Sequence, residues 1–168
     1  MNPCKNRYVL SKHLAEQACG FYSRWMPIVN VRLSNIYGPT RRPLWDLIHG
    51  PCRKLLEQGR ACMWSTLAER DFLYVEDAAE AIVKLLEADF AGTVNLGSGT
   101  MTSAGRIRQM LEQASGGVIE VLDQPVEGSA RFQCDITRLR DLTGWTPRCS
   151  IEEGVRRTFE IMKSWSRA

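Results

Sequence analysis

The sequence predicts an α/β protein built on parallel strands, and three observations support this fold class. Short runs rich in β-branched residues alternate with segments of helical periodicity along almost the whole chain. Glycine and proline separate most of these segments. The chain has 168 residues, 44% of them hydrophobic and 24% charged, which suits one globular domain with a real core. This composition excludes intrinsically disordered and low-complexity chains.

The first quarter of the chain predicts a helix followed by a buried strand. Residues 7–22 carry apolar side chains at four-residue steps, which indicates an amphipathic helix. Residues 28–33 are rich in β-branched residues, and the turn pair Gly38 and Pro39 closes the segment that follows. The apolar line of the helix consists of Leu10, Leu14 and Ala18.

The middle of the chain repeats this alternation. Helical spacing over residues 44–58 stops at Gly59, and a short strand is predicted at 61–64. Residues 72–75 are expected to be extended. Residues 76–88 then predict a helix with one apolar face and a charged opposite face.

The last part of the chain predicts two more strands and two more helices. Residues 93–99 form a short strand that runs into a glycine turn. The helix at 102–114 begins with a threonine and a serine, either of which can cap it. A strand is expected at 118–122. Ser150 and Glu153 have the spacing of a capping box for a final helix.

The cysteine pattern argues against metal and thioredoxin-type redox sites. No CxxC pair is present and the chain has only two histidines, so no metal site is expected. The even number of cysteines leaves disulfides open, but we expect the thiols to be buried as small hydrophobic groups. The cysteines are Cys4, Cys19, Cys52, Cys62, Cys134 and Cys149.

Charge and hydropathy indicate a cytoplasmic protein. The net charge of +3 comes from 22 basic and 19 acidic residues without a run of one sign, so no nucleic-acid partner is expected. No apolar stretch follows Met1 as in a signal peptide, and none approaches the roughly 18 residues that a membrane span needs. We therefore expect no membrane association.

Tyr8 and Lys12 are the first candidate catalytic pair. Four residues apart on a helix, they would share a face with about 5 to 6 Å between their Cβ atoms. An ammonium beside a phenol favours the phenolate form, so the tyrosine could exchange a proton near neutral pH. A YxxxK spacing alone is weak evidence, because it arises often by chance.

Five motifs occur in a fixed order: YVLSKHLAEQ, VRLSNIYGP, RDFLYVEDAAEAIVKLLE, VNLGSG and LTGWTPRCSIEEGVRRTFE. Together they resemble the extended short-chain dehydrogenase/reductase family, specifically its NAD-dependent nucleotide-sugar epimerases and dehydratases. The resemblance covers nearly the whole chain. It implies NAD or NADP as cofactor and a nucleotide sugar as substrate.

The resemblance also implies roles for individual residues. Tyr8 corresponds to the general acid/base at the sugar hydroxyl, and Lys12 to its partner, which also bonds the nicotinamide ribose. Both are therefore catalytic and cofactor-binding candidates. Asn35, Ile36 and Tyr37 match the segment that lies beside the nicotinamide, and Asn35 is a substrate-binding candidate as well.

Arg70, which opens RDF, matches an arginine that approaches the phosphates or base of the substrate, a role that suits a planar guanidinium. Asp77 matches the start of the following helix, where a carboxylate favours the helix dipole. The usual GxG before RDF is replaced here by Ser65–Glu69. This departure bears on the details of the pocket around Arg70.

Structural interpretations remain open beside these roles. Tyr8 could be a half-buried core residue with its lysine neighbour lying along it. Arg32 could pair with a carboxylate, and Asn35 could hold a turn. Arg70 and Asp71 could form a surface charge pair.

The resemblance is to the back half of such an enzyme, because the glycine-rich first strand and turn and the Ser or Thr before the YxxxK helix are missing. We expect a partial Rossmann-like parallel sheet, completed by residues 1–40 and 70–100. A small α/β substrate-binding lobe would come from 41–69 and 101–168. The cofactor site should be incomplete, and one sheet edge and the apolar face of the 7–22 helix should lack cover.

Two functions follow from the sequence. The first is a nucleotide-sugar epimerase or dehydratase, present as a truncated form, that removes and returns a hydride with tyrosine as acid/base. The second is a non-catalytic binding remnant or subunit that needs a partner chain to complete the NAD site. A homodimer is possible in either case.

Overall fold

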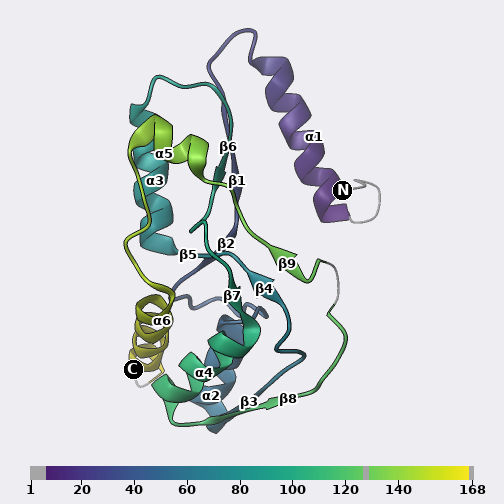
Figure 1. The fold of residues 1–168 in the computed structure, drawn as a ribbon, viewed down its shortest axis with the longest axis vertical. Coiled ribbons are helices and arrows are strands. Elements are labelled where there is room, and N and C mark those ends of the chain that lie inside the picture. Colours follow the sequence, from purple (N-terminus) through teal and green to yellow (C-terminus); the bar gives the residue numbers. More distant parts are fainter. Residues whose placement is uncertain (1–6, 127–128, 167–168) are drawn as a thin grey trace.

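The computed structural model describes residues 7–126 and 129–166 (Figure 1). The helices are α1 (Arg7–Tyr22), α2 (His49–Gln58), α3 (Val75–Glu87), α4 (Ala104–Ser115), α5 (Thr137–Thr143) and α6 (Ile151–Trp165). The longer strands are β1 (Val29–Leu33), β3 (Arg60–Met63), β6 (Gly92–Leu96) and β8 (Val118–Val121). The shorter strands are β2 (Asn35–Tyr37), β4 (Glu69–Arg70), β5 (Phe72–Tyr74), β7 (Thr102–Ser103) and β9 (Arg131–Phe132).

The predicted α/β class with parallel strands is confirmed. Three strand pairs are parallel, namely β1 with β6, β2 with β5 and β3 with β8. In the β1–β6 pair, Val31 lies opposite Val94. The short strand β4 lies between β7, which is antiparallel to it, and β9, which is parallel. The sequence did not predict α5 or these two-residue strands.

The elements gather at two ends of the long axis (Figure 1). At one end, β1 and β6 are flanked by α3 and α5 on one side and by α1 on the other. At the other end, α2, α4 and α6 pack around β3 and β8. Each end has its own hydrophobic core. The sheet-end core comprises Leu73, Ala78, Ala81, Leu85, Val94, Leu96, Leu139 and Trp145. The larger core of the other end includes Tyr37, Ile48, Cys52, Leu55, Tyr74, Ile107, Leu111, Ile119, Val155 and Phe159.

The predicted helix caps are confirmed, and one helix start differs. The Ser103 hydroxyl accepts the Arg106 N–H at 3.1 Å, and the Ser150 hydroxyl accepts the Glu153 N–H at 3.2 Å. Helix α2 begins at His49 rather than at residue 44, because the Asp46 carboxylate accepts the N–H groups of Ile48 and His49 at 2.9 and 2.8 Å. That carboxylate therefore serves as the start signal of the helix.

Helix α1 forms as predicted, and its apolar line lacks cover, also as predicted. No residue of α1 is buried, and Leu10 and Leu14 are 38% and 57% exposed. On the other side of the β1–β6 pair, α3 buries one face against the sheet-end core. The two helices that flank these strands are therefore held very differently.

The buried carboxylate of Asp71 joins three segments that are distant in sequence. Asp71 is fully buried. One carboxylate oxygen accepts the Ser98 N–H and hydroxyl at 2.7 and 2.8 Å, and the other accepts the Gly99 and Cys134 N–H groups at 3.0 and 3.1 Å. A Cβ on Gly97 would lie 2.7 Å from this second oxygen, so the close approach requires glycine. Four donors thus replace the water that the charge loses on burial.

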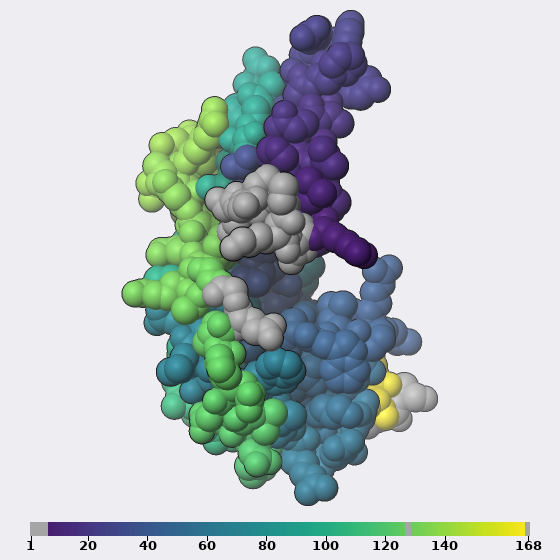
Figure 2. Space-filling view, turned by 90° about the vertical axis from the view of Figure 1, so that its right-hand side faces the viewer, coloured from purple at the N-terminus to yellow at the C-terminus, as the bar shows by residue number. Residues whose placement is uncertain are grey.

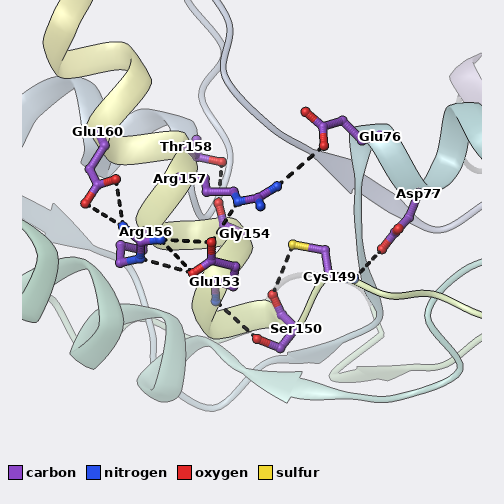
Figure 3. A network of polar contacts seen from close by, with 10 residues as sticks. All are labelled: Glu76, Asp77, Cys149, Ser150, Glu153, Gly154, Arg156, Arg157, Thr158 and Glu160. Carbon is purple, nitrogen blue, oxygen red and sulfur yellow. Dashed lines mark hydrogen bonds and ion pairs between the residues drawn. The ribbon is translucent and has the colours of Figure 1, made fainter.

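A second buried carboxylate joins α3 to the segment before α6 (Figure 3). Asp77 is 5% exposed, and its Oδ2 accepts the N–H groups of Arg148 and Cys149 at 3.1 and 2.9 Å. The sequence assigned Asp77 only a dipole role, whereas its main contacts are these bonds to a distant loop. Arg157 of α6 extends the connection, with contacts to Glu153 at 2.7 Å and to Glu76 of α3 at 3.5 Å.

The cysteine prediction holds for part of the set. Cys52 and Cys134 are buried free thiols, and burial raises the pKa of Cys52 to about 12. Cys62 is a free thiol but is exposed, so the expectation of burial was wrong there. Cys4 lies outside the described residues. Within the described ranges, no helix combines the length and apolar character needed to span a membrane.

The Asp71 cluster predicts a large stability effect. Asp71→Asn should lower the free energy of unfolding by about 3 kcal/mol, because an amide offers one acceptor oxygen and turns N–H groups toward buried donors. Urea unfolding followed by circular dichroism measures the change. Asp141→Asn is the control, because this side chain is 67% exposed and paired with Arg140 at 3.8 Å, and its midpoint should match the parent. Equal midpoints for both variants would contradict a structural role for Asp71.

Candidate functional site

Tyr8 and Lys12 share one face of α1, as their spacing predicted. The Lys12 ammonium lies 5.5 Å from the centre of the Tyr8 ring. Tyr8 is 68% exposed, which argues against the alternative of a half-buried core tyrosine. A phenol and an ammonium are therefore presented together on an accessible surface.

An ion pair joins α1, which carries Tyr8 and Lys12, to strand β1. Arg32 of β1 donates to both carboxylate oxygens of Glu16 at 2.8 and 2.6 Å, so the interpretation of Arg32 as a strand arginine paired with a carboxylate is confirmed. The hydrogen bond from Arg32 holds the pKa of Glu16 below its usual value. Tyr8 and Glu16 are eight residues apart, which corresponds to about 12 Å along the helix axis. Three to four residues of strand beyond Arg32 span a similar distance, roughly 10 to 13 Å. Helix α1 runs antiparallel to β1, so the N-terminal end of α1 is the end nearer to β2 (Figure 1).

Asn35, Ile36 and Tyr37 form β2 and differ in accessibility. The Asn35 amide donates to the Asp71 carbonyl at 2.9 Å, so Asn35 joins β2 to a distant segment, and the alternative that it holds a turn is wrong. Ile36 is partly buried and packs against the sheet-end core. Tyr37 is 4% exposed, and its hydroxyl lies so close to Gly154 of α6 that a Cβ there would overlap it. A contact between Tyr37 and a cofactor would therefore use the main chain.

Arg70 lies at the end of β4 and is partly buried. Its Nη1 donates to the carbonyls of Glu69 at 3.0 Å and Ala130 at 2.7 Å, so one nitrogen of the guanidinium holds the chain near β9. The alternative of a surface charge pair with Asp71 is wrong, because Asp71 is fully buried among backbone donors. The phosphate-binding role of Arg70 stays a prediction.

The glycine turn at 97–99 is confirmed as a turn and not as a phosphate cradle. Gly99 has a left-handed φ of 74°, and the N–H groups of Ser98 and Gly99 point at the Asp71 carboxylate. Such a nest of amides attracts an anion. Here the anion is part of the protein.

A hollow of about 650 Å³ lies between α2 and β3, and the sequence did not point to it. Trp45 and Trp64 line it and are 73% and 61% exposed. The Lys54 ammonium lies 5.9 Å from the Trp45 ring, which brings a positive charge to the rim. In Figure 2 the segment around the hollow, in blue, lies below the purple α1. The further lining residues are Asp46, Leu47, Gly50, Pro51, Gln58, Arg60, Ala61, Cys62 and Met63.

The volume and chemistry of this hollow are those of a small-molecule site. Exposed tryptophan is uncommon on a surface without a partner, and two such side chains beside lysine and arginine suit a flat, negatively charged ligand. Among the described residues, no group of three or more His, Cys, Asp or Glu could hold a metal ion.

Comparison with known proteins supports the sequence-based interpretation. The NAD dependent epimerase/dehydratase family model matches residues 2–97, which is more than half of the chain. The chain belongs to this family. The resemblance inferred from the five motifs is therefore confirmed.

Relatives within the family act on several nucleotide sugars. The dTDP-D-glucose 4,6-dehydratase of Mus musculus is 30% identical over 172 residues, covering 92% of this chain and 47% of its own length. The GDP-mannose 3,5-epimerase of Arabidopsis thaliana is 28% identical over 167 residues, covering 95% of this chain and 44% of its own length. The chain thus spans about half the length of the curated relatives it matches.

A solved family structure has the same fold. The UDP-glucuronic acid 4-epimerase from Bacillus cereus, in complex with UDP-glucuronic acid and NAD, superimposes with a TM-score of 0.82 at 26% identity. The match covers 94% of this chain and 52% of the epimerase. The Rossmann-like architecture predicted from the sequence is confirmed.

The Arg32–Glu16 pair predicts a local effect on α1. Glu16→Gln should leave the thermal midpoint nearly unchanged, because the pair is largely exposed, with side chains 58% and 29% accessible. Hydrogen exchange of the α1 amides should accelerate several-fold, because α1 has no buried residue to hold it. Glu160→Gln on α6 is the control and should leave α1 exchange unchanged. Parent-like exchange in Glu16→Gln would show that other contacts hold α1.

Proposed function

We propose that this chain supplies the acid/base pair and the substrate-binding lobe of an NAD-dependent nucleotide-sugar epimerase or dehydratase. The observation that carries the proposal is the exposed Tyr8–Lys12 pair on α1, a helix that the Arg32–Glu16 ion pair joins to β1. The family membership and the nucleotide-sugar enzymes among its relatives support the substrate class.

The chemistry assigned to the chain is proton transfer at the sugar hydroxyl. The Tyr8 oxygen takes the hydroxyl proton while the hydride leaves the same carbon, which becomes a ketone; the reverse transfer returns both. The Lys12 ammonium lies 5.5 Å from the centre of the Tyr8 ring, so a positive charge stands beside the phenol that takes the proton. When bound, NAD accepts this hydride and later gives it back.

The candidate residues of this chain fit the nicotinamide end of the cofactor. Lys12 and Tyr8 would hold the nicotinamide ribose, and the main chain of Asn35–Tyr37 would lie beside the ring. In the described part of the chain, the glycine turn that precedes α4 has its amides occupied by Asp71, so it does not fit the pyrophosphate. The cofactor site of this chain would therefore be incomplete.

The hollow between α2 and β3 is the proposed place of the nucleotide part of the substrate. Trp45 and Trp64 can stack on a base, and Lys54 and Arg60 bring positive charge for the diphosphate. Arg70 follows in β4 and is the proposed further phosphate contact. The hollow lies within the 41–69 segment that the sequence assigned to substrate binding.

A second candidate is a binding module that acts only with another chain. The observation that favours it is the uncovered side of the sheet end. Among the described strands, β1 pairs with β6 alone, and α1 buries no residue. A further parallel α/β unit, whether from a longer form of this chain or from a partner, would supply the missing strands and pyrophosphate turn. A second copy of this chain is the other proposed partner for this surface.

Nucleotide binding tests the hollow on the chain as it is. Titration with UDP, GDP and dTDP should quench tryptophan fluorescence, because two of the five tryptophans line the hollow. Trp64→Phe should weaken binding by about 10-fold, consistent with losing part of a stacking contact. Trp25→Phe is the matched control, since Trp25 is equally exposed but lies beyond α1. Unaltered binding in Trp64→Phe, or weakening in Trp25→Phe, would move the nucleotide site elsewhere.

Catalysis is tested with the missing unit restored, as a fusion or as a separate chain taken from a full-length relative. Tyr8→Phe should lower kcat by about 10² to 10⁴ while nucleotide-sugar binding stays close to the parent, because the ring is kept and the hydroxyl is lost. Lys12→Met should reduce both turnover and NAD affinity.

The chain alone should bind NAD poorly by calorimetry, because the amides of the glycine turn in its described part are occupied by the Asp71 carboxylate. Micromolar affinity would contradict an incomplete cofactor site. A kcat for Tyr8→Phe within a few-fold of the parent would remove the catalytic assignment and leave the binding module as the better description.

A further inference from the structure

His49 is a buried histidine that the proposed reaction does not use. It is the first residue of α2 and is 4% exposed. Its Nδ1 lies 2.6 Å from Asp46 Oδ2, and its Nε2 lies 2.6 Å from the Gly38 carbonyl oxygen. The ring thus bridges the turn before α2 and the residue that follows β2.

Both partners of the ring are acceptors, which decides its protonation state. A carbonyl oxygen has no proton to give, so Nε2 must donate to Gly38. Asp46 also accepts the N–H groups of Ile48 and His49 on its other oxygen, which favours its ionised form. A neutral imidazole can donate from only one nitrogen, whereas the imidazolium donates from both.

The shifts in pKa agree with this geometry. Burial lowers the pKa of His49, but the hydrogen bonds to Asp46 and Gly38 outweigh it, and the net pKa lies above the usual value. For Asp46, burial raises the pKa, and the bonds from His49 and Ile48 outweigh that effect and lower it. Each group stabilises the charged form of the other.

Among the described residues, Asp46 is the charged group that acts on His49. The Cys52 thiol on the next turn of α2 and the phenols of Tyr37 and Tyr74 stay neutral, because burial raises the pKa of each. Arg53 turns away to the carbonyls of Arg41 and Arg42. The charged residues of α4 and α6, the helices packed on α2, apart from Lys163 form the ion pairs Arg106–Glu152, Arg108–Glu112, Arg156–Glu153, Arg156–Glu160 and Arg157–Glu153. Those of β3, Arg60 and the Cys62 thiol, are exposed.

We propose that His49, held between Asp46 and Gly38, is a proton-dependent positioning residue that fixes residues 35–39 to the start of α2. The importance of residues 35–39 rests on the proposed function, in which they lie beside the nicotinamide and the sugar. Asp46 also lines the hollow. The two short hydrogen bonds of the His49 ring therefore connect the nucleotide end of the proposed site to its reactive end.

The sign of the pH dependence follows from the raised pKa of His49. The stabilisation is fully present below the unfolded value of about 6.5 and is lost as pH rises through the higher folded value. Above that pH, one of the two bonds loses its proton. Residues 35–39 should then be held less firmly to α2, while the rest of the fold is unaffected.

The first experiment needs neither substrate nor cofactor and uses the whole chain. ¹⁵N NMR of the ring nitrogens should show that His49 titrates above its ordinary value of about 6.5. Hydrogen-exchange protection factors of the β2 amides should fall several-fold as pH rises through that titration. His49→Gln should remove this pH dependence, and His13→Gln, which changes the other and exposed histidine, should leave it intact.

Asp46→Asn keeps the shape of the site and guards against a variant that fails to fold. The asparagine oxygen can still accept the helix N–H groups, but its amide favours a neutral ring that donates to Gly38. The His49 titration should therefore shift to lower pH, and protection of β2 should instead fall on acidification.

Titration of His49 at or below about 6.5 in the parent, or β2 protection that does not change with that titration, would overturn the proposal. These readouts stand apart from the proposed function, which fails only if nucleotide binding or restored turnover is absent. With the missing unit restored, His49→Gln should raise KM for the nucleotide sugar or lower kcat most strongly at low pH, where the parent His49 holds both of its hydrogen bonds. An equal effect at every pH would reduce His49 to a purely structural residue.

Discussion

The Asp71 carboxylate is the constraint on which the arrangement of the site depends. It is fully buried, and its two oxygens are satisfied by donors from the 97–99 turn and from the segment after β9. Its own carbonyl accepts the main-chain and side-chain N–H groups of Asn35. Arg70 precedes it in the chain. The candidate residues of β2 and β4 therefore take their positions from one buried charge.

The two hydrophobic cores support different parts of the candidate site. The core around α2, α4 and α6 supports the hollow, and its helices are held by ion pairs and by Asp77. The core around β1 and β6 supports the strands whose ends lead to Asn35 and Asp71. The Tyr37–Gly154 contact and the His49 bridge are placed between these regions, so β2 is in contact with both. The proposed site would thus place substrate binding in one region and reaction at the edge of the other.

Local patterns predicted much of the fold and little of the site. Helices α3, α4 and α6 followed from apolar periodicity and from caps such as Ser150, because these signals lie within one turn of the helix they start. Helix α5, with seven residues, is too short for periodicity to show. The Tyr8–Lys12 face followed from spacing alone. Asp71 depends on partners 27 to 63 residues away, and His49 depends on Gly38, 11 residues before it. The hollow depends on the packing of α2 on β3, so no local pattern contained these features.

Helix α1 has a thermodynamic consequence of its own. It has sixteen residues and no buried side chain, which places it near the length at which helices are only marginally populated in water. Its order then depends on whatever surface covers its apolar line, and the free energy of that contact includes the ordering of the helix. The Tyr8–Lys12 face exists only while the helix is formed. Assembly of the acid/base pair and docking of its cover would thus be one cooperative event, with a helix–coil transition as the step that couples them.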